Sequence, residues 1–113
     1  MTVNDPNAIP EMKLDQENLY HEETFSDLKM GWIRRLTPVN PDGTRDKRRE
    51  SIFIGQTQLA SPQGPIPIQC QIQAKTLPEA LKKFPEYMEM TMKQMVERAM
   101  ELKREASSRI ITP

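Results

Sequence analysis

The chain has 113 residues, and 16 basic against 16 acidic residues give it a formal net charge of zero. Its length allows one domain, while 36% hydrophobic residues and 10 prolines indicate that part of it does not join a packed core. The single cysteine excludes an intrachain disulfide and a multi-cysteine zinc site. No apolar run approaches the roughly 18 residues of a membrane span, and the N-terminus lacks the apolar region of a secretory signal. We therefore expect a soluble cytoplasmic protein that does not contact membranes.

Charge is distributed unevenly along the chain. Residues 1–28 carry seven acidic residues and one basic residue, residues 29–49 carry a net charge of +5, and residues 50–113 carry +1. The first segment also lacks a sustained apolar period, so it buries too little apolar area to offset an ordering entropy of about 1–2 kcal/mol per residue. We expect residues 1–28 to be a largely disordered acidic tail and residues 29–113 to form a single small α+β domain.

Two segments after the tail have the composition of paired β-strands. Residues 32–39 and 48–59 are rich in β-branched or aromatic residues and flank a turn sequence at residues 40–43. In that turn Pro41 fixes φ at about −65° and Gly43 accepts a positive φ. These features predict an antiparallel hairpin.

A third strand is predicted after a second turn sequence at residues 61–64. Apolar and polar side chains alternate strictly over residues 66–74, and a period of two is typical of a strand with one buried and one solvated face. Pro67 has no N–H to donate, so we expect this strand at an edge of the sheet. The three strands together predict an antiparallel β-meander.

A long amphipathic helix is predicted over about residues 77–107, across the sheet. Thr76 and Glu79 have the spacing of a capping box at its start. Its apolar stripe consists of residues spaced by three or four: Leu77, Leu81, Phe84, Met88, Met92, Met95, Ala99, Leu102 and Ala106. Pro85 removes one helical hydrogen bond, at a cost of about 3 kcal/mol, so we expect a kink or a restart of the helix near it.

This helix is longer than the sheet that it would cover. About 31 helical residues span roughly 46 Å, whereas a nine-residue strand spans only about 30 Å, so a straight helix would project beyond the sheet. We therefore expect contact with a second copy or with a partner helix, and a non-enzymatic function in protein–protein interaction as a homodimer or as a subunit of a complex. The predicted partner-helix contact consists of Met88, Met92, Met95, Val96, Ala99, Met100 and Leu102.

The sequence offers little for catalysis. His21 is the one histidine and falls in the acidic tail, so no Ser-His or Cys-His arrangement within a folded core is available. Cys70 falls on the inward side of the third predicted strand, as a buried structural thiol would. The methionines of the helix could bind Cu(I) through their thioethers, but their spacing fits adaptable core packing better. We predict no catalytic residue, cofactor or metal site, while a composite active site between subunits stays open.

The basic hairpin is the main alternative site. Its possible nucleic-acid contacts are Trp32, Arg34, Arg35, Arg45, Lys47, Arg48 and Arg49. Basic side chains on a two-stranded ribbon can contact phosphates and an aromatic ring can stack on a base, although a solvated hairpin with cross-strand ion pairs is the simpler interpretation. The alternative function is a regulatory nucleic-acid-binding protein whose basic hairpin, residues 34–49, is masked by residues 1–28.

A strand followed by the sequence TLPEAL at residues 76–81 and an amphipathic helix resembles the corresponding stretch of HicB-type antitoxins. The glycine-rich strand of that family is replaced here by QCQ at residues 69–71. The resemblance implies a small strand–strand–helix module that acts by binding, and it does not assign the chain to the family.

Overall fold

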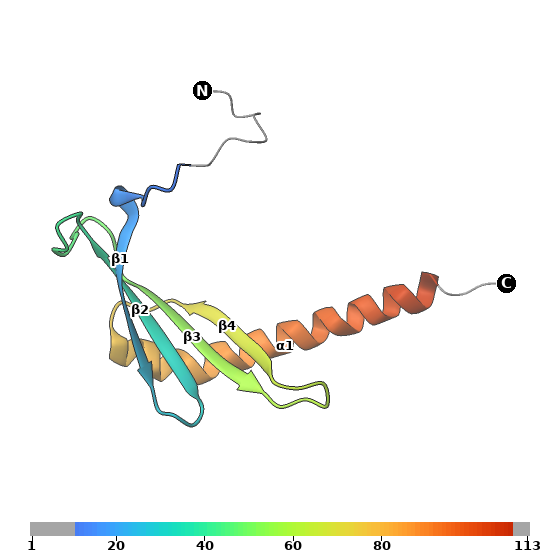
Figure 1. Cartoon of the computed structure of the whole chain (residues 1–113). Helices are drawn as coiled ribbons and strands as arrows, with labels where there is room; N and C mark the ends of the chain where they lie inside the picture. Colours follow the sequence, from blue (N-terminus) through green and yellow to red (C-terminus); the bar gives the residue numbers. More distant parts are fainter. Residues whose placement is uncertain (1–10, 110–113) are drawn as a thin grey trace.

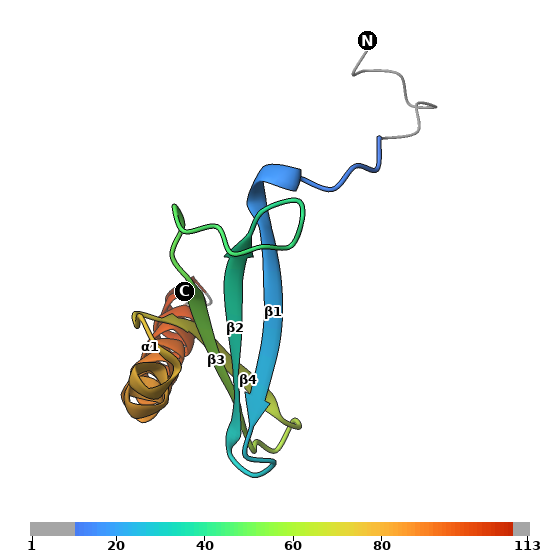
Figure 2. The same cartoon turned by 90° about the vertical axis from the view of Figure 1, so that its left-hand side faces the viewer.

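The computed structural model describes residues 11–109. A 3₁₀ turn at Gln16–Asn18 leads into strand β1 (Leu19–Ser26), which is followed by β2 (Gly31–Val39), β3 (Ile52–Leu59), β4 (Ile66–Ile72) and helix α1 (Leu77–Arg109). The strands form one antiparallel sheet in the order β1-β2-β3-β4. Helix α1 lies on one face of this sheet and extends well past it (Figures 1 and 2).

The α+β class is confirmed, but the sheet has four strands and not the three predicted. Residues 19–26, assigned above to a disordered tail, form β1, and each pairs with a residue of β2, from Leu19 opposite Val39 to Ser26 opposite Trp32. Strand β1 is ordered because it pairs with β2. Its acidic composition alone does not reveal this pairing. Residues 11–15 have no regular secondary structure, and the expected disorder of residues 1–10 lies outside the described residues.

The connections between strands follow the predicted turns, with one shift. The strand predicted over residues 48–59 begins only at Ile52, because residues 40–51 form a long loop. Gly43 in this loop has a φ of 89°, and Gly64 in the turn between β3 and β4 has a φ of 113°. Glycine adopts such backbone conformations at no steric cost, so both predicted turns are confirmed.

Strand β4 is an edge strand, as predicted from Pro67, because it pairs only with β3. The predicted alternation of burial is also present. Ile68 and Ile72 are each 1% exposed, whereas Pro67, Gln69 and Gln71 between and beside them are exposed. The buried face of β4 is therefore the face that α1 covers.

The core lies between the sheet and the first half of α1. Ile33, Phe53, Ile72 and Ala80 form its buried cluster. Gly55 lets the helix approach closely, since a Cβ atom at this position would lie 3.1 Å from Cδ2 of Phe84 and 3.2 Å from Cε of Met88. Gly55 of the sheet thus leaves room for the side chains of Phe84 and Met88 of the helix.

The opposite face of the sheet has no element of the described chain packed over it (Figure 2). Side chains alternate along a strand, so Trp32, Leu36, Ile52 and Ile54 lie on this face, and all four are half-buried. Leu36 pairs with Ile52 across β2 and β3. Such cross-strand pairs shield one another in part.

Helix α1 begins as predicted and does not break. The backbone N–H of Glu79 donates to Oγ1 of Thr76 at 3.3 Å, and Oε2 of Glu79 accepts from the N–H of Lys75 at 3.4 Å. The helix runs through Pro85 without interruption, so the predicted restart is wrong. Leu81 and Pro85 are both exposed, and water can therefore satisfy the Leu81 carbonyl oxygen that Pro85 cannot bond.

Candidate functional site

A continuous run of exposed residues that includes several large apolar side chains lies on the second half of α1. Every residue from Lys93 to Ala106 is exposed, and the exposed fractions include 40% for Met95, 58% for Met100 and 57% for Leu102. Figure 1 shows this part of α1 projecting beyond the hairpin of β3 and β4. We call residues 93–109 of α1 the overhang.

The predicted partner-helix contact divides between the core and the overhang. Met88 is only 6% exposed and lies over Gly55 of the sheet, and Met92 is half-buried, so the first of these two residues already has its partner within the chain. The other five predicted residues are exposed: Met95, Val96, Ala99, Met100 and Leu102. The candidate contact therefore begins at about Met92.

The apolar spacing of the covered half of α1 continues along the overhang. Met92, Met95, Ala99, Leu102 and Ala106 follow one another at alternating distances of three and four residues. This is the heptad spacing with which helices pair through knobs-into-holes packing. The overhang, at about 1.5 Å per residue, is roughly 25 Å long, and a helix of this length without tertiary contacts is marginal in water.

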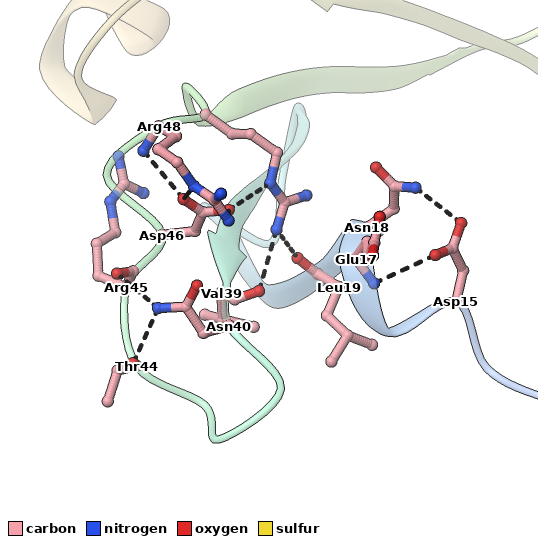
Figure 3. Close-up of polar contacts among 11 residues, drawn as sticks. Asp15, Glu17, Asn18, Leu19, Val39, Asn40, Thr44, Arg45, Asp46 and Arg48 are labelled. Atoms are coloured by element: carbon pink, nitrogen blue, oxygen red, sulfur yellow. Dashed lines mark hydrogen bonds and ion pairs between the residues drawn. The ribbon is translucent and has the colours of Figure 1, made fainter.

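The basic hairpin is held together by its own acidic residue (Figure 3). Asp46 is 4% exposed and accepts hydrogen bonds from the backbone N–H of Arg48 at 3.0 Å, from Nε of Arg48 at 3.1 Å and from Nε of Arg49 at 2.9 Å. These hydrogen bonds, those from Arg48 foremost, hold the pKa of the Asp46 carboxyl well below its usual range. We call these three residues the Asp46 cluster.

Arg49 connects this cluster to the first two strands. Its guanidinium donates to the carbonyl oxygen of Leu19 at 3.1 Å and to that of Val39 at 3.0 Å, and it lies 5.0 Å from the ring centroid of Tyr20. Hydrogen bonding to Asp46 raises the pKa of Arg49. Arg49 therefore connects the loop at residues 40–51 to the end of the β1–β2 pair.

The two arginines of β2 are paired with the carboxylates of β1. Arg34 lies 3.5 Å from Glu22, and Arg35 lies 2.8 Å from Glu23. Arg35 also lies over the ring of Phe25, 5.0 Å from its centroid. The sequence predicted that an acidic tail neutralises the basic hairpin, because an acidic segment directly precedes a basic one. What it missed was that this segment is a strand in register with β2.

The remaining predicted nucleic-acid contacts, Trp32, Arg45 and Lys47, lie outside these ion pairs. Arg45 donates to Oγ of Ser51 at 3.1 Å, Trp32 is half-buried on the open face of the sheet, and Lys47 is exposed in the loop. The structure thus pairs Arg34 and Arg35 with acidic partners, while Lys47 is exposed in the loop.

Reactive side chains are scattered over the described chain. Cys70 is half-buried, with Sγ 3.7 Å from the carbonyl oxygen of Tyr87, and His21 is exposed on β1. Residues 11–109 contain no group of three or more His, Cys, Asp or Glu residues placed to hold a metal ion. An open apolar cavity of about 300 Å³ between the β1–β2 turn and α1 is lined by one carboxylate, Asp27. That carboxylate already accepts the N–H groups of residues 29–31.

Comparison with known proteins adds no assignment. No family model matches the chain, and neither the curated proteins nor the solved structures give a significant match. The resemblance to HicB-type antitoxins therefore stays a resemblance of one short stretch. Within the described residues, α1 does not contain a stretch apolar enough to cross a lipid bilayer.

Proposed function

We propose that this protein is a non-enzymatic interaction protein that works as a homodimer through the overhang of α1. The observation that carries this proposal is the continuity of one apolar stripe along the helix. Its first part buries Met88 against the sheet, and its second part leaves Met95 and Leu102 exposed at the same spacing. Monomeric proteins seldom expose a contiguous apolar surface unless it binds a partner.

The apolar side chains of the overhang can supply a useful part of the association free energy. Full burial of a Leu, Met or Val side chain contributes about 1.5–3 kcal/mol. Met95, Val96 and Leu102 are each between 40% and 57% exposed, and a symmetric dimer would cover them on both copies. Packing would also stabilise a helical segment that has no tertiary support of its own in a single chain.

The test is the oligomeric state of the full chain, measured by sedimentation equilibrium and by light scattering over a range of concentrations. We expect a mass near twice the 13.1 kDa of the chain at tens of micromolar, with dissociation on dilution. A monomer at tens of micromolar would contradict the proposal.

A matched pair of methionine substitutions locates the contact. Met95 and Met90 are 40% and 44% exposed, but Met95 lies on the stripe and Met90 lies on the opposite side of the helix. We expect Met95→Ala to weaken the dimer by about tenfold, near 1.4 kcal/mol, and Met90→Ala to leave it unchanged. Equal effects of the two substitutions would place the contact elsewhere.

The alternative function in nucleic-acid binding is less well supported, because four of the five arginines of the hairpin form ion pairs with Glu22, Glu23 and Asp46. Deleting residues 1–28 would remove β1, so Glu22→Gln with Glu23→Gln is the better test of masking. Binding of a labelled duplex at low salt that increases in this variant, and is lost with Arg48→Glu, would favour the alternative.

A further inference from the structure

We propose that the second copy binds the overhang in an antiparallel orientation, with Ala99 of one copy facing the partner's Leu102. This inference rests on the proposed homodimer and adds its orientation and register. Three features of the described helix carry it: the order of large and small residues along the stripe, the length left free by the sheet, and the charges beside the stripe.

Large and small residues alternate along the stripe. In heptad terms Met95 and Leu102 occupy the d positions, while Ala99 and Ala106 occupy the a positions. A parallel pair places a against a, so Ala99 would face the partner's Ala99 across a gap that the neighbouring large layers hold open. An antiparallel pair places a against d, so each layer joins one alanine to one large side chain, which is how packed cores avoid voids.

The free length of the helix fits one register. With Ala99 facing the partner's Leu102, Met95 faces the partner's Ala106, and the end of the partner's helix at position 109 lies level with Met92. Met92 is half-buried, while every residue from Lys93 to Ala106 is exposed. The paired length therefore ends where the sheet begins to cover α1. A shift that moved the two copies further into each other would drive each helix end against the other copy's sheet.

The charges beside the stripe select the same orientation and register. Arg98 and Glu105 occupy the g positions, which face g positions of the partner in an antiparallel pair. In this register Arg98 lies beside the partner's Glu105, and the twofold axis repeats the contact. A shift by one heptad in either direction would instead pair Arg98 with the partner's Arg98, or Glu105 with the partner's Glu105.

The parallel orientation has the opposite electrostatics. There, g positions face e positions of the following heptad, so Arg98 would lie beside the partner's Lys103 on both sides of the dimer. Like charges at such positions disfavour a pairing even where the attractive pairs contribute little. Sterics, free length and charge thus agree on the antiparallel pair.

The experiment measures the dimer dissociation constant of the full chain at low salt for three charge variants. Arg98→Glu and Glu105→Arg each place like charges together in the antiparallel register, and we expect each to raise the dissociation constant by about tenfold. An equimolar mixture of the two variants should associate as tightly as the wild type, because each heterodimer restores both attractive pairs. This recovery also shows that neither variant is misfolded.

Arg104→Glu is the control, since it makes the same charge change on the far side of the helix. It also removes the oppositely charged neighbour of Glu101, which lies three residues away along the helix. We expect the dimer dissociation constant of this variant to equal that of the wild type. If Arg98→Glu tightens the dimer, the pair is parallel and this inference is wrong while the homodimer stands. If the mixture fails to recover, or all variants bind like the wild type, the register is also wrong. A wild-type monomer at tens of micromolar would overturn the homodimer and this inference together.

Discussion

The sheet-packed region, residues 19–92, and the overhang, residues 93–109, are built from similar side chains but differ in what those side chains contact. In the first region Met88 is 6% exposed and Asp46 is 4% exposed, and both have partners within the chain. In the overhang the same apolar spacing leaves Leu102 57% exposed. The difference teaches that amphipathicity specifies a face to be covered, and that the length of the sheet decides how much of that face the chain covers itself.

The largest effect should come from truncating a core side chain, and it should differ clearly between the two regions. Met88→Ala removes a buried side chain that packs over Gly55, and we expect the free energy of unfolding to fall by about 2–4 kcal/mol. Leu102→Ala should change it by less than about 0.5 kcal/mol in the monomer. Urea denaturation at protein concentrations below the dimer dissociation constant measures both. A similar loss in the two variants would mean that Leu102 is buried within a single chain.

The next effect should come from Gly55. Gly55→Ala places a Cβ atom 2.8 Å from Cδ1 of Ile72 and 3.1 Å from Cδ2 of Phe84. Overpacking of this kind costs about 1–3 kcal/mol, because α1 must move away from the sheet. Thermal unfolding and urea denaturation measure the loss. An unchanged stability would mean that the helix does not pack as closely on the sheet as Gly55 allows.

The Asp46 cluster should give the sheet-packed region its own dependence on pH. The pKa of Asp46 is lowered in the folded state, so its contribution to stability is fully present above its unfolded pKa of about 3.9 and is lost as the pH falls through the lowered value. We expect Asp46→Asn to be less stable than the wild type at neutral pH, with the difference narrowing below about pH 4. Denaturation curves at several pH values measure this. A difference that stays constant down to low pH would contradict it.

The smallest effect should lie at the border between the two regions. Glu89 and Lys93 form an exposed ion pair along α1, with 3.4 Å between Oε1 and Nζ. Pairs of this spacing contribute about 0.2–0.5 kcal/mol to a helix, so Glu89→Gln should lower the free energy of unfolding by no more than that. Circular dichroism during urea titration measures it. A loss above about 1 kcal/mol would show that Glu89 has a further contact.

Predictions from the sequence were most accurate where the signal was local. The turns that contain Gly43 and Gly64 are present because their backbone conformations favour glycine, whatever the rest of the chain does. The edge position of the strand with Pro67 and the cap at Thr76 follow from a missing donor and from an available acceptor. Of the candidate contact, the residues from Met95 onward are exposed and their role in binding a partner stays a prediction, while Met88 is buried against the sheet of the same chain.

The errors arose where the outcome depends on distant residues. Leu19–Ser26 is too acidic and too poor in apolar residues to predict a strand, and it becomes one because β2 offers backbone partners and because Arg34 and Arg35 balance Glu22 and Glu23. Likewise, the charge of the basic hairpin was evident, but its use within the chain was not. Asp46 is two residues from Arg48, and only the folded loop shows that it is buried between two guanidinium groups.

The sequence by itself determined the class of fold, two of the turns and the apolar stripe of α1, because backbone conformation and side-chain periodicity are properties of neighbouring residues. Only the tertiary structure decided that a fourth strand forms, that α1 passes Pro85 unbroken, and that the stripe outruns the sheet at Met92. These outcomes depend on contacts between segments far apart in the chain, whose free energy no local pattern contains.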